Sequence, residues 1–213
     1  GGNTMKTEIV FILDRSGSMA GLEKDTIGGY NAMLKKQKQL VEHATVTTVL
    51  FDDEYTLLHD RIDINGIAPM TEKEYEVRGA TALLDAIGKS ILKMEQVQNA
   101  TLVEARAEKV LFVITTDGEE NASVEFTYPK IKKLIERQKE RGWEFIFLGA
   151  NIDAIGEASK LGIESERAVQ YHADSEGTQV NFATLSEAIV EFRQTGSIKS
   201  KWKEKIEQDF SSR

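Results

Sequence analysis

Cysteine is absent from the 213-residue chain, proline occurs twice and histidine three times. Without cysteine the protein has no disulfide framework, no thiol nucleophile and no thiolate zinc site. The histidines His43, His59 and His172 lie in unrelated segments without the spacing of metal ligands, so each is expected to be a surface or packing residue. A metal site in this protein would therefore be built from oxygen ligands.

Positive charge and long hydrophobic runs are also scarce. The 27 Lys and Arg residues are outnumbered by 35 Asp and Glu, which gives a net charge of −8, whereas binding to nucleic acids and anionic membranes needs a basic face. Apolar runs such as residues 9–13 and 110–114 are far shorter than the ~20 residues of a membrane-spanning helix. We expect a cytoplasmic protein that binds neither nucleic acid nor membranes.

What is present is the composition of one globular domain. Hydrophobic residues make up 40% of the chain and charged residues 29%, and about 100–200 residues suffice for a domain. Residues 1–5, which end at Met5, look like a remnant of cloning. Residues 6–196 are expected to form the domain, and residues 197–213 a C-terminal tail or helix. Apolar residues recur every four positions in this tail, which favours docking on the core over a strip that binds a partner.

Short apolar runs alternate with longer stretches of helical periodicity. The runs predict strands near residues 9–13, 46–51, 55–59, 110–114, 145–148 and 168–171. The periodic stretches predict helices near residues 22–41, 84–94, 128–138, 155–161 and 182–192. This alternation predicts an α/β fold: a Rossmann-like, doubly wound, mostly parallel six-stranded sheet with one antiparallel edge strand and helices on both faces.

Helix ends are marked less clearly. Gly142, Gly162 and Gly196 follow three of the predicted helices, where a glycine commonly ends a helix. The helix starts are expected to be capped, or occupied in the first turn, by Asp25, Thr71, Asn151 and Ser175.

Polar residues follow two of the buried strands. Asp14, Ser16 and Ser18 come after the first strand at alternating positions, and Asp117 comes after the fourth. Alternate side chains of an extended segment point the same way, and ligands collect beyond the carboxyl ends of parallel strands. Two carboxylates and two hydroxyls at one edge suit a hard cation such as Mg²⁺. The alternative is an ordinary turn, because Asp, Ser and Gly are common in any loop.

These residues also carry a family resemblance. The run Asp14-Arg15-Ser16-Gly17-Ser18 resembles the DxSxS motif of von Willebrand factor type A (vWA) domains. Thr81 lies in a similar G-x-T-x-hydrophobic context, and Asp117 lies in the T-D-G context of the third element. The resemblance covers about residues 6–192. The chain is also similar to stand-alone, cysteine-free bacterial vWA proteins, including the group associated with tellurite resistance.

The resemblance implies a metal ion-dependent adhesion site (MIDAS) with Mg²⁺, or Mn²⁺, as its cofactor. Its ligands would be Asp14, Ser16, Ser18, Thr81 and Asp117. The serines would bind the metal directly, Thr81 directly or through water, and the aspartates mostly through water. A Glu or Asp carboxylate of a partner protein would complete the coordination, so the protein would be a binding module and not an enzyme. No acidic residues occur in residues 19–22, so no adjacent calcium site is expected.

Two other functions fit parts of the pattern. A Mg²⁺-dependent phosphohydrolase of the haloacid dehalogenase type also ends a strand with an aspartate, but it needs a general acid where Ser16 stands. A regulatory subunit of an ATPase complex would keep the same metal site.

The remaining candidates have simpler explanations. Asp52, Asp53 and Glu54 are expected to form a solvated hairpin turn, and residues 130–141 a basic, solvated helix face or a partner contact. His172 and Asp174 would either border the site or belong to an ordinary loop. Residues 119–121 would line its rim or cap the following helix.

Overall fold

The computed structural model describes residues 6–213, so the expectation for residues 1–5 lies outside the described residues. Its centre is a six-stranded sheet in the order β3-β2-β1-β4-β5-β6. The strands are β1 Thr7–Asp14, β2 Ala44–Phe51, β3 Tyr55–Asp63, β4 Lys109–Thr116, β5 Glu144–Gly149 and β6 Ala168–Gln170. All pairings are parallel except that of β3 with β2. The predicted mostly parallel sheet with one antiparallel edge strand is confirmed.

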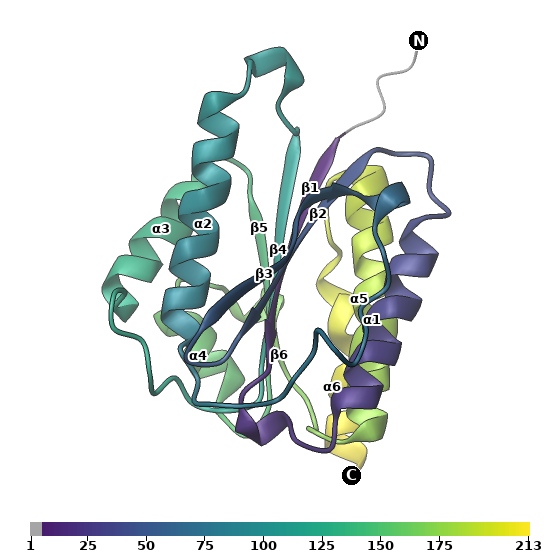
Figure 1. Cartoon of the computed structure of the whole chain (residues 1–213), viewed down its shortest axis with the longest axis vertical. Helices are drawn as coiled ribbons and strands as arrows, with labels where there is room; N and C mark the ends of the chain where they lie inside the picture. The colour runs from purple at the N-terminus through teal and green to yellow at the C-terminus, as the bar shows by residue number, and fades with distance from the viewer. Residues whose placement is uncertain (1–5) are drawn as a thin grey trace.

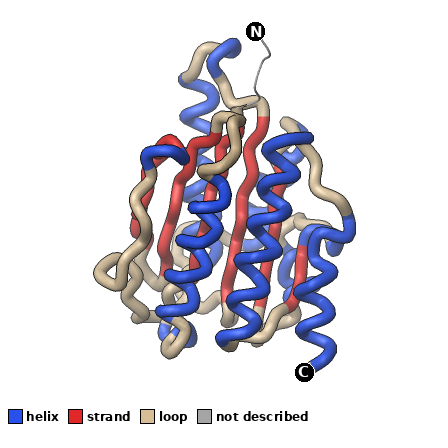
Figure 2. Tube along the Cα trace, turned by 90° about the vertical axis from the view of Figure 1, so that its right-hand side faces the viewer, coloured by secondary structure: helices blue, strands red, loops and turns tan. Residues whose placement is uncertain are grey.

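Helices cover both faces of this sheet (Figures 1 and 2). They are α1 Glu23–Gln37, α2 Leu83–Ala100, α3 Tyr128–Glu140, α4 Ala154–Lys160, α5 Ser175–Thr195 and α6 Glu204–Ser212. On β1, Ile9, Phe11 and Leu13 pack with α1, α5 and α6, whereas Val10 and Ile12 pack with α2, α3 and α4. Because every residue of β1 is buried, its continuous apolar run fits a central parallel strand.

Several helix ends differ from the expectation. Gly142, Gly162 and Gly196 do adopt positive φ after their helices, as predicted. The side chains that cap helix starts, however, are Thr127 for α3, Asp153 for α4 and Asp174 for α5. Asp25 and Ser175 lie in first turns, whereas Thr71 closes a turn with Glu74 and Asn151 precedes the α4 cap.

The helix predicted to reach residue 41 is shorter than expected. Helix α1 ends at Gln37, and Val41 is 84% exposed instead of facing the core.

The C-terminal tail packs against the domain. Ile198 and Ile206 are buried in the core cluster that contains α5, and Trp202 is partly buried against the same cluster. Near the end of the tail, the ring of Phe210 stacks on His172, with 4.6 Å between the ring centroids. The four-residue spacing of the tail is thus explained by docking.

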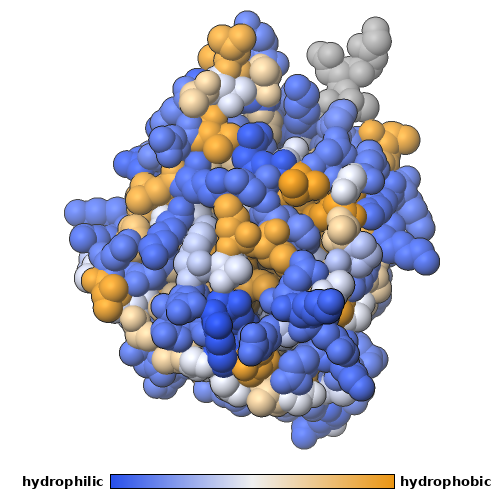
Figure 3. All heavy atoms as spheres, viewed as in Figure 1, coloured by the Kyte–Doolittle hydropathy of each residue, from blue (hydrophilic) through white to orange (hydrophobic). Residues whose placement is uncertain are grey.

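The surface in the view of Figure 1 is mostly hydrophilic (Figure 3). An exception is the connection between α2 and β4 at the top of the molecule, where Leu102 and Val103 are 73% and 72% exposed. Within residues 6–213, no helix combines the length and apolar composition that crossing a membrane requires.

Candidate metal site

The ends of β1 and β4 create a polar edge on the sheet. The two strands are parallel neighbours at the middle of the sheet. From β1 the strand order proceeds through β2 and β3 to one edge, and from β4 it proceeds through β5 and β6 to the other. This reversal of strand order lies between β1 and β4, where open α/β sheets bind their ligands. The strand ends bring Asp14 and Asp117 to this point, as predicted.

Asp14 is held by hydrogen bonds from its neighbours. It is 1% exposed. Its Oδ1 accepts from the amide of Ser16 at 2.7 Å, and its Oδ2 accepts from Thr116 Oγ1 at 2.8 Å and from the amide of Asp117 at 3.2 Å. Both carboxylate oxygens are therefore occupied by donors of the chain itself, which fixes the first ligand loop to the end of β4.

Ser16, Ser18 and Asp117 form a continuous group of oxygen atoms. The hydroxyls of Ser16 and Ser18 are 3.0 Å apart, and Ser18 donates a hydrogen bond to Asp117 Oδ1. Gly17, between the two serines, contacts the facing loop through its backbone amide, which donates to the carbonyl of Gly79 at 3.0 Å. The predicted convergence of these side chains is present.

Asp117 has an incomplete set of partners. It is 1% exposed, and its Oδ2 is buried without a hydrogen-bond partner. Its pKa is raised to about 6: burial is the main cause, the charge of Asp14 adds to it, and the hydrogen bond from Ser18 acts in the opposite direction. A buried carboxylate oxygen without a donor is unfavourable in the metal-free protein, and a cation would relieve that cost.

Thr81 lies on a third loop, which contacts both of the others through its backbone. Its amide donates to Asn121 Oδ1 at 2.8 Å, and its carbonyl accepts from the amides of Asn121 and Ala122. On the other side, the amide of Gly17 donates to the carbonyl of Gly79 at 3.0 Å. Thr81 is 5% exposed, and these contacts place its loop between the loops that carry the serines and Asp117.

The donor set fits a hard divalent cation. Within residues 6–213, no three His, Cys, Asp or Glu side chains are grouped closely enough to hold a metal ion by themselves. A site at this edge therefore depends on the hydroxyls as much as on Asp14 and Asp117. Oxygen donors without imidazole or thiolate match the preference of Mg²⁺ and Mn²⁺.

Two of the residues expected at the rim, Glu120 and Asn121, fasten the loop after β4 to the start of α2 and to Thr81. Glu120 accepts hydrogen bonds from the amides of Leu84, Ala122 and Ser123. It therefore helps to cap the preceding helix, α2, and not the following helix as the sequence suggested. Asn121 supports Thr81 as described above.

Asp85 strengthens this attachment and was not singled out from the sequence. Its carboxylate accepts from the amides of Val124, Glu125 and Phe126 at 2.9–3.0 Å. The sequence does place an acidic residue in the first turn of a predicted helix, but that pattern does not indicate which loop the carboxylate contacts.

Other supports of the site were also missed. The buried hydroxyl of Tyr75 donates to the carbonyl of Asp14 at 2.6 Å, and the Asn151 side chain donates to the carbonyl of Asp117 at 3.0 Å. No sequence pattern indicated either contact, because each joins segments far apart in the chain.

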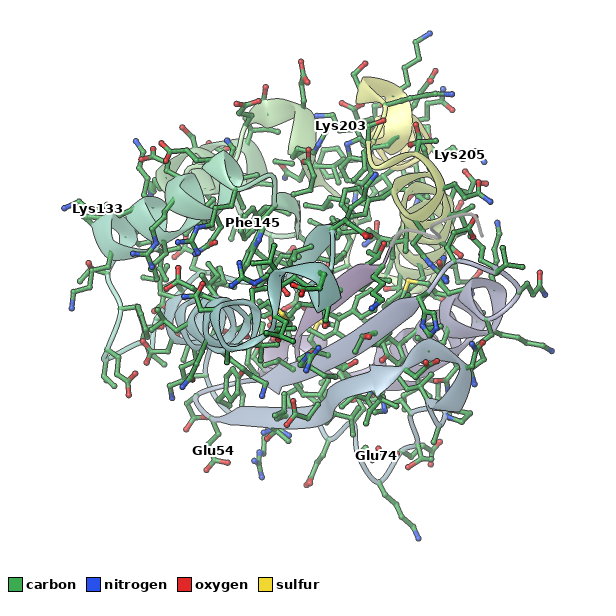
Figure 4. All side chains as sticks on the ribbon, turned by 90° about the horizontal axis from the view of Figure 1, so that it is seen from above. Glu54, Glu74, Lys133, Phe145, Lys203 and Lys205 are labelled. Atoms are coloured by element: carbon green, nitrogen blue, oxygen red, sulfur yellow. The ribbon has the colours of Figure 1, made fainter. Side chains whose placement is uncertain are left out.

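The prediction of a solvated turn was wrong for Asp52. Asp53 and Glu54 are exposed, and Glu54 points outward in Figure 4. Asp52 is only 1% exposed because it pairs with Arg15 and Arg78. An acidic tripeptide gives no indication of which carboxylate turns inward to a distant arginine.

His172 and Asp174 contact the tail. Nε2 of His172 lies 2.9 Å from the carbonyl oxygen of Phe210, and Asp174 pairs with Arg213. Of the basic helix, Arg137 pairs with Glu95, whereas Lys133 points away from α3 (Figure 4).

Comparison with known proteins identifies the fold. No protein-family model and no curated protein matches the sequence. Among solved structures, the vWF domain of the pilus tip protein Mfa5 from Porphyromonas gingivalis has a TM-score of 0.63 at 11% identity, over 93% of this chain and 99% of that one.

Two further solved structures are similar. The manganese-loaded TRAP protein of Plasmodium vivax gives a TM-score of 0.60 at 16% identity, over 84% of this chain and 74% of that one. A variant of the PilB minor pilin from Streptococcus sanguinis gives 0.61 at 14% identity, over 93% of this chain. The chain spans 62% of that pilin.

The architecture is thus that of a Rossmann-like α/β domain with its polar edge at the β1–β4 switch point. More narrowly, the chain has a vWA fold. The finer resemblance to proteins associated with tellurite resistance stays a prediction.

Proposed function

We propose that this protein is a binding module that holds Mg²⁺ or Mn²⁺ and, through the metal, a carboxylate of a partner protein. One observation carries the proposal: the buried Oδ2 of Asp117 has no hydrogen-bond partner, yet it belongs to a carboxylate joined to the hydroxyls of Ser18 and Ser16. A cation bound there would neutralise the buried charge of Asp117.

The proposed ligands divide into two roles. Ser16, Ser18, Thr81 and Asp117 offer oxygens to the metal. Asp14 contributes charge and position, because its two oxygens already accept three hydrogen bonds from the chain. When bound, the cation supplies a Lewis-acidic position for an anionic oxygen from outside. The similarity to a TRAP protein described as manganese-loaded supports a divalent metal at such a fold.

Binding is favoured over phosphoryl transfer by the environment of Asp14. Both oxygens of Asp14 accept hydrogen bonds from buried groups, which stabilise its negative charge and make it a weaker nucleophile. The position of the general acid is occupied by Ser16, whose hydroxyl is too weak an acid for that role. We therefore propose that the protein is not an enzyme.

Acetate is a minimal probe for this proposal, with acetamide as its neutral counterpart. In the presence of Mg²⁺, acetate should shift the NMR signals of backbone amides at Gly17, Ser18 and Gly118, and acetamide should not. Shifts of equal size in EDTA, or no shifts with Mg²⁺ at high acetate, would contradict binding of a carboxylate through the metal.

A further inference from the structure

We propose that Asp52 is a positioning residue that joins the loop carrying Ser16 and Ser18 to the loop carrying Thr81. The inference rests on the proposed function, because the two loops supply different ligands of the same metal. It assigns a role to a residue outside the MIDAS pattern.

The side chain of Asp52 contacts one arginine from each loop. Its Oδ1 lies 3.4 Å from a terminal nitrogen of Arg15, within the DxSxS segment. Its Oδ2 accepts from Nε of Arg78 at 3.2 Å, three residues before Thr81. Asp52 is 1% exposed and Arg15 is 4% exposed, so their charges are poorly screened by water.

Backbone hydrogen bonds run along the same junction. The carbonyl of Asp52 accepts from the amide of Ala82 at 2.7 Å. The amide of Arg78 donates to the carbonyl of Arg15 at 2.9 Å, and the amide of Gly17 donates to the carbonyl of Gly79 at 3.0 Å. Asp52 thus holds the Thr81 loop through both its side chain and its backbone.

Gly79 shows how closely the parts fit. Its φ is +70°, a conformation that favours glycine, and a β-carbon there would overlap a carboxylate oxygen of Asp53 and lie 2.6 Å from Asp52 Oδ2. The loop of Thr81 therefore passes directly over the Asp52 carboxylate. If that carboxylate loses its charge, Arg15 remains buried without its counter-ion, and the contact between the two loops weakens.

The test combines Asp52→Asn with Thr81→Ala in a double-mutant cycle, with Mg²⁺ affinity measured by calorimetry. We expect Asp52→Asn to weaken Mg²⁺ binding by about 10-fold or more, as loss of an outer partner of a metal ligand commonly does. Because part of the effect of Asp52 is to position Thr81, Asp52→Asn should weaken Mg²⁺ binding less in the Thr81→Ala background than in the wild type. Additive losses would overturn the proposal.

Amide hydrogen exchange in EDTA tests the junction without metal. In Asp52→Asn, the amides of Gly17 and Arg78 should exchange about tenfold faster, while amides in the middle of β1 keep their rates. Unchanged exchange at Gly17 and Arg78 would overturn the proposal, regardless of the Mg²⁺ affinity of the variant. If these amides exchange faster in Asp52→Asn but the wild-type protein binds no Mg²⁺, the junction is supported and only the proposed function is contradicted.

Glu8→Gln is the matched control. Glu8 is likewise a buried carboxylate on the sheet that pairs with an arginine, Arg61, but it lies at the opposite end of β1. This variant should leave Mg²⁺ affinity and the exchange at Gly17 and Arg78 unchanged. Equal effects in Glu8→Gln would show a general loss of stability and overturn the proposal.

Arg78→Gln keeps the experiment informative if Asp52→Asn does not fold. Arg78 is 45% exposed, so its replacement leaves the buried pair of Arg15 and Asp52 in place. Arg78→Gln should weaken Mg²⁺ binding and speed amide exchange in the same way as Asp52→Asn, but to a smaller extent. No change in either measurement would overturn the proposal.

Discussion

Asp14 and Asp117 end neighbouring strands, but their surroundings differ. Asp14 accepts hydrogen bonds at both oxygens, whereas Oδ2 of Asp117 has no donor and the pKa of Asp117 is raised to about 6. In the folded, metal-free protein the ionised form of Asp117 is therefore disfavoured. Since the folded pKa lies above the ordinary value of 3.8, this group lowers stability as pH rises from about 4 to about 6.

Asp117→Asn is thus expected to stabilise the metal-free protein. At pH 7.5 in EDTA, urea denaturation should give a free energy of unfolding about 1–2 kcal/mol above that of the wild type, since the buried charge is removed. Addition of Mg²⁺ should stabilise the wild type and leave the variant nearly unchanged, which reverses the order. A variant that is less stable than the wild type in EDTA would contradict this account of Asp117.

His59 should make stability depend on pH in the opposite direction. Its Nδ1 lies 3.1 Å from the Tyr30 hydroxyl and 3.0 Å from the Thr48 hydroxyl, and burial lowers its pKa. Because the folded protein disfavours the protonated ring, stability is fully present above the unfolded pKa of about 6.5 and is lost as pH falls below it.

Urea denaturation between pH 8 and pH 5 checks this effect by comparison of variants. His59→Asn, which does not titrate, should lose less free energy of unfolding over this range than the wild type. Parallel curves for His59→Asn and the wild type would exclude the buried ring as the cause.

At the scale of elements, α1 contains two adjacent glycines with different surroundings. A β-carbon on Gly28 would meet nothing within 4 Å, whereas a β-carbon on Gly29 would overlap the ring of Phe182 on α5. Gly28→Ala should therefore raise the free energy of unfolding by about 0.5–1 kcal/mol through helix propensity. Gly29→Ala should lower it by about 1–3 kcal/mol through overpacking. Thermal and urea denaturation of the two variants measure these changes. If both substitutions changed the free energy of unfolding in the same direction, the packing of α1 on α5 described above would be wrong.

The elements themselves were predictable. Strands that are buried on both faces require continuous apolar runs, and helices that pack on the sheet require an apolar face with helical periodicity. The run at residues 9–13 is central in the sheet, and residues 110–114 lie beside it. Helix starts were predicted less well. Asp, Ser and Thr occur at several nearby positions, and a cap is decided by the backbone conformation of one of them, such as Asp153.

The site was predictable only in part for a related reason. Asp14, Ser16, Ser18 and Asp117 follow strands, so the strand prediction placed them together. The buried pairing of Asp52 depends on two arginines distant in sequence, and the support of Thr81 depends on Asn121. Contacts of this kind join loops whose conformations no local pattern specifies.

For the whole molecule, the net charge of −8 should matter for metal binding. An acidic protein attracts Mg²⁺, and the Debye length falls from about 30 Å at 0.01 M salt to about 10 Å at 0.1 M. Mg²⁺ affinity should therefore fall several-fold between these KCl concentrations. Glu104→Gln removes a charge at the far end of the sheet, about 25 Å away by strand length, and should leave affinity at 0.1 M unchanged. A salt-independent affinity would contradict this electrostatic contribution.

Titration of the protein with Mn²⁺ and Mg²⁺ by calorimetry tests the central claim most directly, with Asp14→Ala and the Ser16→Ala/Ser18→Ala double variant alongside the wild type. The account predicts one site in the wild type, loss of binding in both variants, and folded protein in each case, because the core strands do not need the metal. Binding of the wild-type strength in the variants, or no binding in the wild type, would contradict a metal site at the β1–β4 edge.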